Sequence, residues 1–392
     1  MKKIIIFGNL DIPEGSAGAT RCIAFGKIAK SCGYDPIVLG VNYARNSKIK
    51  GEYNGIKYEL IDFDELGFKG RHRKKRNKAL KENVLKWLNE HCSKEDTASI
   101  IMYNVKAELK WLLKYSKEED IPLIKDVVEW YDKNNFNGIA GMFNYIEDRI
   151  GLLYYNKKCK NIIAISSLFE RYYKSKKCNV VRIPTILDVA EFDNNYSEAD
   201  DIVKIAYAGS PMKKDYISNV VKSMLLLDDS DREKIKIHFY GITWEYFLSN
   251  GITEEQKDML EGYVICHGRV SFDEVKNGVS KANYTILLRP NERYANAGFP
   301  TKVGESMAMG IPVIANITSD LDLYLHENVE GIVCENETPE ACAVALKKAI
   351  NVNTAIRNEM RKNARRQAEK SFDYRMYTND FGNFLEKAIS EK

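Results

Sequence analysis

The chain has 392 residues, which is too long for one ordinary hydrophobic core, so we expect two domains. Its 44% hydrophobic and 29% charged residues fit a globular protein, and no apolar run reaches the roughly 18 residues needed to span a bilayer. The 8 cysteines form no C-x-x-C pair and the 5 histidines do not cluster, which argues against zinc and favours free thiols in a reducing cytoplasm. The net charge of +4 includes one basic run, Lys69–Lys81.

In the first half of the chain, buried strands alternate with helical stretches. Apolar runs followed by turn residues predict strands, and amphipathic spacing predicts the helices between them. The expected strands are residues 2–8, 35–41, 97–104, 121–129, 161–166 and 179–188, and the expected helices include residues 18–33 and 105–119. This order is typical of a doubly wound parallel sheet.

A polar stretch at residues 188–201 interrupts the pattern and is the best candidate for a linker. The alternation then resumes, with a helical tail after residue 338 that breaks at Ser371–Tyr374. The expected strands are residues 203–209, 235–241, 263–268, 283–290, 310–316 and 330–335. We therefore predict two Rossmann-like domains, residues 1–190 and 191–374, with a helix at about 375–392 packing back on the first.

Ligands of such folds bind at the carboxyl ends of the strands, so the loops there are the candidate sites. After the first strand, Gly15 and Gly18 precede a helix whose amides could face an anionic or sugar ligand, although a plain turn explains them equally well. They do not form the G-x-G-x-x-G dinucleotide fingerprint. After residues 203–209, Gly209 and Ser210 lead to Lys213 and Lys214, which could bind a phosphate or remain solvated.

Two later segments add candidate ligands for a nucleotide. Arg289 immediately follows an apolar strand, and Arg293 comes four residues later. The two arginines could bind a ligand at this strand end, or they could form surface salt bridges. The stretch GFPTKVGE begins a helix, and we expect Thr301 to be its N-cap and Lys302 and Glu305 to lie in its first turn. The free backbone amides at the helix start could bind a diphosphate. The Glu305 carboxylate could accept hydrogen bonds from two ribose hydroxyls, or it could simply be an acid that the helix dipole favours.

The segments from Ile205 to Asn316 resemble the donor domain of retaining family 4 glycosyltransferases, which have the GT-B fold. The signature of that family is a Glu, seven residues, a second Glu, a helix of small residues and then G-x-P-V-I. Glu305 matches the second Glu, and the tail is matched by Gly310, Pro312, Val313 and Ile314. The resemblance covers most of the chain and is weakest from about Asn54 to Glu95. The FPTK…E variant looks like a subgroup of capsular and O-antigen polysaccharide enzymes.

The resemblance implies roles for individual residues. It places Glu305 on the ribose of a UDP or GDP sugar and Lys214, with Lys213 less favoured, on the diphosphate. The implied donor-binding set is Gly18, Gly209, Ser210, Lys213, Lys214, Arg289, Gly298, Phe299, Pro300, Thr301, Lys302 and Glu305. One departure concerns the transferred sugar: Ala297 stands where the family has its first Glu, so Asn296 or the backbone of Ala297–Phe299 would have to bind the sugar.

On the acceptor side, Glu129 follows a strand of the first domain and is our candidate, with Asp126 and Asp132 as alternatives. A helix-start acid explains these residues nearly as well. The expected catalytic residues are Glu129, Lys214 and Arg289, in a sugar transfer with retention and without metal or other cofactor. No catalytic base is evident, which fits a leaving phosphate that takes the acceptor proton.

The basic run Lys69–Lys81 holds eight lysines and arginines and no acid, which leaves about −4 for the rest of the chain (4 minus 8). It could bind anionic headgroups and serve a polyprenyl-linked acceptor at the inner face of a membrane, or be a solvated loop. The run contains no interleaved aromatic residues, so it gives no support to nucleic-acid binding. Two other functions stay open: a nucleotide-sugar 2-epimerase, for which His267 stands alone as a candidate, and a non-catalytic partner protein, which Ala297 favours.

Overall fold

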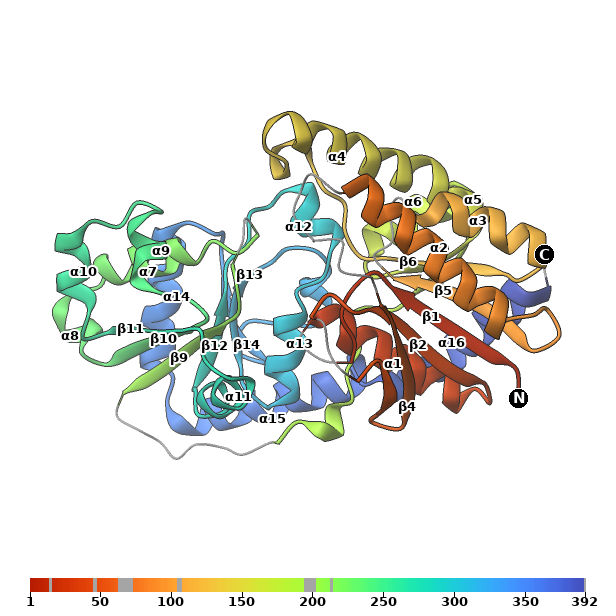
Figure 1. The fold of residues 1–392 in the computed structure, drawn as a ribbon. Helices are drawn as coiled ribbons and strands as arrows, with labels where there is room; N and C mark the ends of the chain where they lie inside the picture. Colours follow the sequence, from red (N-terminus) through yellow and green to blue (C-terminus); the bar gives the residue numbers. More distant parts are fainter. Residues whose placement is uncertain are drawn as a thin grey trace. The chain divides into compact units, whose positions relative to one another are not determined.

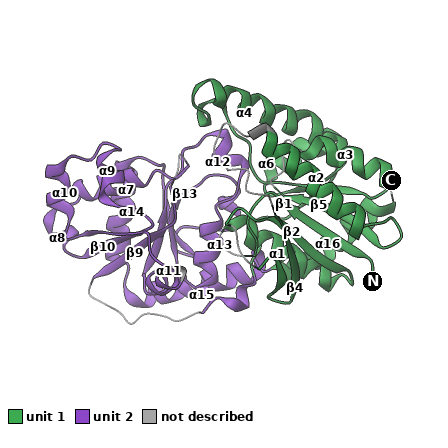
Figure 2. Cartoon of the chain, viewed as in Figure 1, with its two compact units in different colours: residues 1–187, 374–392 green, residues 188–373 purple. Residues whose placement is uncertain are grey.

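The computed structural model describes residues 1–13, 16–44, 48–62, 73–103, 108–193, 202–211 and 214–390, with only the backbone of residues 73, 74 and 272. Two compact units make up the chain. Unit 1 comprises Met1–Leu187 and Tyr374–Lys392, and unit 2 comprises Asp188–Asp373 (Figure 2). The boundary lies a few residues before the one expected from the sequence. Of the expected linker, residues 194–201 lie outside the described part of the chain.

Unit 1 contains one eight-stranded sheet in the order β3-β4-β2-β1-β5-β6-β7-β8 (Figure 1). Its pairs are all parallel except β3 with β4. The strands are β1 (Lys3–Gly8), β2 (Asp35–Val41), β3 (Lys50–Tyr53), β4 (Ile56–Ile61), β5 (Thr97–Tyr103), β6 (Leu123–Val127), β7 (Asn161–Ala164) and β8 (Asn179–Arg182). This parallel arrangement confirms the predicted fold class, whereas the β3–β4 hairpin was not predicted.

Helices cover both faces of this sheet, because alternate side chains of β1 point to opposite sides. Ile4 and Ile6 pack with α1 and α16, and Ile5 and Phe7 pack with α2 and α3. The helices are α1 (Ala17–Ser31), α2 (Arg73–His91), α3 (Glu108–Glu119), α4 (Gly138–Ile150), α5 (Asn156–Cys159), α6 (Ser167–Ser175) and α16 (Thr378–Ser390), with a π-helical turn at Gly151–Tyr155 and short 3-10 turns at Lys133–Asn135 and Tyr374–Tyr377. Helix α16 belongs to unit 1 although it ends the chain.

Unit 2 contains a second sheet, with six parallel strands in the order β11-β10-β9-β12-β13-β14. The strand order reverses between β9 and β12. On one side of this point the sheet continues through β10 and β11, and on the other side through β13 and β14. The strands are β9 (Val203–Ala208), β10 (Ile235–Tyr240), β11 (Val264–Gly268), β12 (Tyr284–Leu287), β13 (Val313–Asn316) and β14 (Gly331–Cys334). A reversal of this kind is where open α/β sheets bind their ligands.

Helices also cover the sheet of unit 2, where α7 packs with α14 and α13 packs with α15. The helices are α7 (Ile217–Leu225), α8 (Asp229–Arg232), α9 (Trp244–Leu248), α10 (Glu254–Leu260), α11 (Phe272–Ser280), α12 (Arg293–Ala297), α13 (Thr301–Ala308), α14 (Pro339–Asn351) and α15 (Thr354–Ser371), with 3-10 turns at Val189–Glu191 and Leu321–Leu323. No helix in the described ranges is long and apolar enough to cross a membrane.

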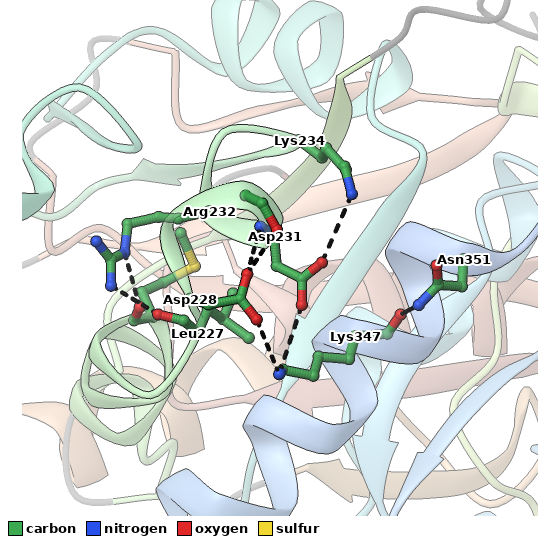
Figure 3. A network of polar contacts seen from close by, with 9 residues as sticks. Leu227, Asp228, Asp231, Arg232, Lys234, Lys347 and Asn351 are labelled. Carbon is green, nitrogen blue, oxygen red and sulfur yellow. Dashed lines mark hydrogen bonds and ion pairs between the residues drawn. The ribbon is translucent and has the colours of Figure 1, made fainter.

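A network of surface charges joins α8 to α14 in unit 2. Lys347 lies 3.5 Å from carboxylate oxygens of both Asp228 and Asp231 (Figure 3). Arg232 donates hydrogen bonds to the carbonyl oxygens of Met224, at 3.2 Å, and Leu227, at 2.7 Å. Because Lys347 and Asp228 are both largely exposed, their pair contributes little to stability, whereas the buried hydrogen bonds of Arg232, which join α8 to the end of α7, are stronger.

Candidate active site

The predicted site residues of unit 2 come from two neighbouring strands at the centre of its sheet. Strands β9 and β12 pair directly, through Ile205 with Tyr284 and Ala206 with Thr285. Their carboxyl ends therefore lie at one edge, where β9 continues into Gly209 and β12 leads to Arg289. Helix α13, which begins at Thr301, adds its first turn to the same place.

A buried carboxylate connects these elements. Asp215 accepts a hydrogen bond from the Arg289 Nε at 2.9 Å, from the Lys302 Nζ at 2.8 Å and from the Tyr207 hydroxyl at 2.7 Å. Its side chain is only 2% exposed, whereas that of Lys302 is 32% exposed. Two of the predicted cations thus converge on an acid that the sequence analysis did not single out.

The partners of Asp215 stabilise its ionised form. Burial alone would raise the pKa of this carboxyl, but the charges of Arg289 and Lys302 and the hydrogen bonds from Lys302 and Tyr207 outweigh burial and lower the pKa below its usual range. Burial and the neighbouring Asp215 raise the pKa of Tyr207, so the phenol stays protonated and donates. The cluster is consequently two cations on one anion, with a net positive charge.

The geometry of the two cations is fixed from several sides. The backbone N–H of Arg289 donates to the Asn316 side chain at 2.9 Å, and the Asn316 amide donates back to the Arg289 carbonyl at 2.7 Å. The Lys302 ammonium lies 5.0 Å from the centre of the Tyr207 ring, within the range of a cation–π contact. Within the described ranges, Asp215 is the sole side-chain partner of the Arg289 guanidinium, so its terminal nitrogens can still bind an anion.

The backbone of Gly209 lies close to the side chain of Lys302. Its φ of +116° lies in the left-handed region, and a Cβ at this position would come within 3.0 Å of the Lys302 Cε. Both the backbone conformation and the close approach therefore require glycine. Ser210 follows as an exposed residue, Lys214 is half-buried, and Lys213 lies outside the described residues.

Glu305 differs from the other acids of unit 2. It is half-buried on α13, and its carboxylate makes no hydrogen bond or ion pair with any residue in the part of the chain that the structure describes. Burial raises the pKa of Glu305, and the charge of Lys302 offsets part of this shift. A carboxylate kept from water without a donor is costly, so this side chain is suited to a ligand that brings hydroxyl donors.

Two local expectations about this segment are wrong. Thr301 is the first residue of α13, and Pro300 takes the N-cap position, because the chain already turns helical at Thr301. Glu305 lies past the first turn, which contains no acid. A favourable interaction with the helix dipole therefore does not explain Glu305, since that effect fades beyond the first turn.

The residues before α13 are mostly structural. Gly298 and Pro300 are buried, and the Phe299 ring packs against Tyr324 and Phe372, with centroids 5.5 and 5.6 Å apart. Ala297 ends α12 and is fully buried.

The Asn296 side chain forms its hydrogen bonds within unit 2. Its amide donates to Asn291 at 2.8 Å and to the Glu292 carbonyl at 3.0 Å, and its oxygen accepts from the Ser319 N–H at 2.8 Å. These contacts hold the loop before α13.

In unit 1, Gly18 and Asp126 have clear structural roles. A Cβ on Gly18 would come within 2.6 Å of the Tyr103 ring, so glycine is needed there for packing, and Gly15 lies outside the described residues. Asp126 is fully buried and forms two hydrogen bonds with Arg21, at 2.7 and 2.9 Å. Arg21 also donates to the carbonyls of Ile183 and Pro184. Asp126 is therefore a core ion pair, and its role as an alternative acceptor-side residue is not supported.

Glu129 and Asp132 lie beyond the carboxyl end of β6 and are both half-buried. Glu129 accepts a hydrogen bond from the Tyr131 hydroxyl. The backbone N–H of Asp132 donates to the Asn135 side chain at 2.7 Å, which starts the 3-10 turn at Lys133–Asn135.

His267 does not stand alone, contrary to the sequence analysis. The His238 Nδ1 and the His267 Nε2 lie 3.0 Å apart on the adjacent strands β10 and β11, and the His267 ring stacks on Tyr240 at 4.3 Å. Burial, the neighbouring His267 and two lysines lower the pKa of His238 to about 4, so it is neutral at pH 7. Within the described residues, no three His, Cys, Asp or Glu side chains are grouped to hold a metal ion.

Comparison with known proteins decides the class of this site. Residues 188–367, nearly all of unit 2, match the sequence model of the family described as glycosyl transferases group 1. The chain carries a glycosyltransferase domain. The Asp215 cluster and Glu305 both lie inside the matched segment. A comparison with curated protein sequences gave no match.

Solved structures extend the likeness to both units. Sucrose-phosphate synthase from Thermosynechococcus elongatus has a TM-score of 0.77 at 15% identity, over 100% of both chains. Anabaena Alr3699/HepE, solved with UDP and glucose, has a TM-score of 0.70 at 15% identity, over 99% of this chain and 100% of that one. WaaG, a glycosyltransferase involved in lipopolysaccharide biosynthesis, has a TM-score of 0.63 at 13% identity, over 97% of this chain and 99% of that one. The glycosyltransferase therefore has the GT-B fold that the sequence predicted.

Proposed function

We propose that this glycosyltransferase moves a sugar from a nucleoside-diphosphate sugar to a glycan or lipid-linked acceptor, with retention of the anomeric configuration. The observation that carries the proposal is Glu305, a half-buried carboxylate with a raised pKa and no partner among the described residues. Two vicinal ribose hydroxyls would supply the two donors that such a carboxylate lacks.

The diphosphate would lie beside Arg289 and Lys302, with Lys214 on the same loop as Asp215. The outer nitrogens of Arg289 offer the planar fork that suits phosphate oxygens, and Lys302 adds a point charge at the start of α13. Asp215 is too deeply buried to contact the ligand and would act as a positioning residue that holds both cations in place.

The proposed reaction breaks the bond between the anomeric carbon and the diphosphate oxygen, and forms one from that carbon to the acceptor hydroxyl oxygen on the same face. The leaving phosphate takes the acceptor proton, so no separate base is required. Arg289, Lys302 and Lys214 would stabilise the charge that develops on the diphosphate, a kind of contribution worth roughly 10²–10³ in rate for a single well-placed donor. The reaction as proposed uses no metal or other cofactor.

Glu129 is proposed as the acceptor-side residue of unit 1, because its half-buried carboxylate lies beyond the carboxyl end of β6, the edge at which parallel sheets bind their ligands. We also propose a role in surface polysaccharide synthesis at the cytoplasmic face of a membrane, and the involvement of WaaG in lipopolysaccharide biosynthesis supports the polysaccharide part of it. The UDP bound by HepE makes UDP sugars the first donors to test.

Thermal shift with UDP, GDP and their sugars tests the donor part of the proposal. We expect stabilisation by at least one nucleoside diphosphate and by its sugar, and no stabilisation by any of them would contradict a donor site in unit 2. Mass spectrometry of a lipid-linked acceptor incubated with the stabilising donor then tests transfer. NMR of the product gives the anomeric configuration, and inversion would rule out the retaining mechanism.

A further inference from the structure

Helix α4 (Gly138–Ile150) and the π-helical turn after it present an apolar stripe to solvent. Six large apolar side chains of this segment are exposed, by 38% to 82% of their surface. They are Ile139, Met142, Phe143, Ile146, Ile150 and Tyr154. The other exposed residues between 138 and 154 are Gly138 and Ala140. Isolated exposed apolar residues are ordinary, but a continuous set of this kind marks a contact surface.

The stripe follows the helical repeat. Positions 139, 143, 146, 150 and 154 are three or four residues apart and so lie on one face, over a length of about 22 Å at 1.5 Å per residue. The opposite face, with Gly141, Asp148 and Leu152, is buried in unit 1. Figure 1 shows α4 along the edge of that unit. The fold therefore anchors the helix by one side, and no residue in the described part of the chain covers its apolar side.

Basic residues border the apolar stripe. Lys158 continues it by one further turn, with its ammonium 4.3 Å from the Tyr154 ring centre, and Lys157 and Lys160 stand beside it. At the other end, the exposed Lys133 precedes α4. Apolar side chains along one face, a tyrosine near the end and lysines beyond it are the composition of a helix that lies in a membrane interface.

We propose that the α4 stripe docks unit 1 on a bilayer surface rich in anionic lipids. The six apolar side chains would enter the boundary between headgroups and acyl chains, and Lys157, Lys158 and Lys160 would contact the headgroup phosphates. This proposal goes beyond the proposed function, because membrane binding through α4 needs neither donor nor acceptor. It also differs from binding through Lys69–Lys81, of which residues 69–72 lie outside the described part of the chain.

Co-sedimentation of the full chain with vesicles tests the proposal without any sugar substrate. We expect binding to vesicles of phosphatidylglycerol and phosphatidylcholine, and weaker binding to phosphatidylcholine alone. The double variant F143E/I146E should lower the partition coefficient by roughly tenfold or more, because it places two charges in the apolar contact. The control V344E/I356E alters two exposed apolar side chains of α14 and α15 with the same charge change, and should bind as the parent does.

A second readout keeps the test independent of a damaged fold. In F143W, the added tryptophan should shift its emission to the blue and be quenched by brominated lipid, whereas V344W should show neither change. Equal vesicle binding by the parent and F143E/I146E, or no quenching of F143W, would overturn the proposal. A parent that forms dimers without lipid, and loses them on F143E/I146E, would instead assign the stripe to a second copy of the chain.

Discussion

The Arg289 Nε donates to the Asp215 carboxylate at 2.9 Å, and this pair joins two loops that are 74 positions apart in the sequence. Lys302 adds a second cation to the same carboxylate. The pair explains how two cations can be held close together at the edge of a sheet before any ligand arrives. Such preorganisation matters because groups that are already placed need not be ordered when the substrate binds.

Replacing Asp215 by Asn should destabilise the ligand-free protein by about 3–5 kcal/mol at pH 7, because it leaves a buried guanidinium without its charged partner. The pKa of Asp215 is lowered in the folded state, so its contribution is complete above the unfolded pKa and is lost as pH falls through the folded pKa. The stability difference between parent and D215N should therefore shrink as the pH is taken from about 5 towards 2.

Urea unfolding across that pH range measures this difference. The matched control is D258N, which changes an exposed aspartate on α10 and should follow the parent at every pH. A D215N variant that is as stable as the parent at pH 7, or a difference that stays constant on acidification, would show that Asp215 does not hold the cations.

Gly209→Ala should lower both stability and nucleotide affinity. The new Cβ would have to adopt a φ of +116° and would press on Lys302 at 3.0 Å, so strain of about 1–3 kcal/mol is expected together with a displaced ammonium. Gly262→Ala is the control, because Gly262 has no heavy atom within 4 Å of the added Cβ. Thermal unfolding and nucleotide titration of both variants check the prediction, and equal behaviour of G209A and G262A would contradict it.

Asp126 and Glu129 should respond differently to loss of charge. Asp126→Asn should cost about 3–5 kcal/mol of stability, because Asp126 is fully buried with Arg21. Glu129→Gln, at a half-buried position, should cost less stability than Asp126→Asn and should lower kcat by roughly tenfold or more, as for a residue that positions the acceptor. Stability curves and steady-state kinetics of both variants separate the two roles. Normal kcat in E129Q would remove Glu129 from the acceptor side.

Strand ends were predictable from the sequence because apolar runs and the glycines after them are local signals. This was enough to predict the parallel sheets and to bring Gly209, Arg289 and Lys302 to one edge. Asp215 was not predicted as a site residue because the cations that it binds lie far from it in the sequence. A signal was nonetheless present, since two cations at predicted strand ends require an acid and Asp215 directly follows Lys214.

Other features depend on contacts that a sequence pattern does not reveal. Asp126 reads as a polar strand-end acid, but Arg21 from α1 makes it part of the core. His267 reads as isolated because His238 is a neighbour only through the pairing of β10 with β11. The α4 stripe has ordinary amphipathic spacing, and only the burial of its opposite face shows that the apolar side is the one left outside.

Glu305→Gln should raise the stability of the ligand-free protein at neutral pH. Burial raises the pKa of Glu305, so its contribution to stability is greatest below the unfolded pKa and is lost as pH rises through the folded pKa. Wherever the carboxyl is ionised, the folded protein bears the cost of burying its charge, which the neutral amide avoids. Thermal unfolding at pH 7 and near pH 4 should show the gain at pH 7 alone, whereas a less stable E305Q at pH 7 would contradict this.

Calorimetric titration of the E305Q variant with a nucleoside diphosphate tests the central claim, that unit 2 binds the donor through Glu305, most directly. The nucleotide is whichever of UDP and GDP stabilises the parent, and E335Q, which alters an exposed glutamate after β14, is the control. We expect E305Q to bind roughly tenfold or more weakly, since it loses charge-assisted hydrogen bonds to ribose, while E335Q binds as the parent does. Equal affinity of E305Q and the parent would contradict the claim.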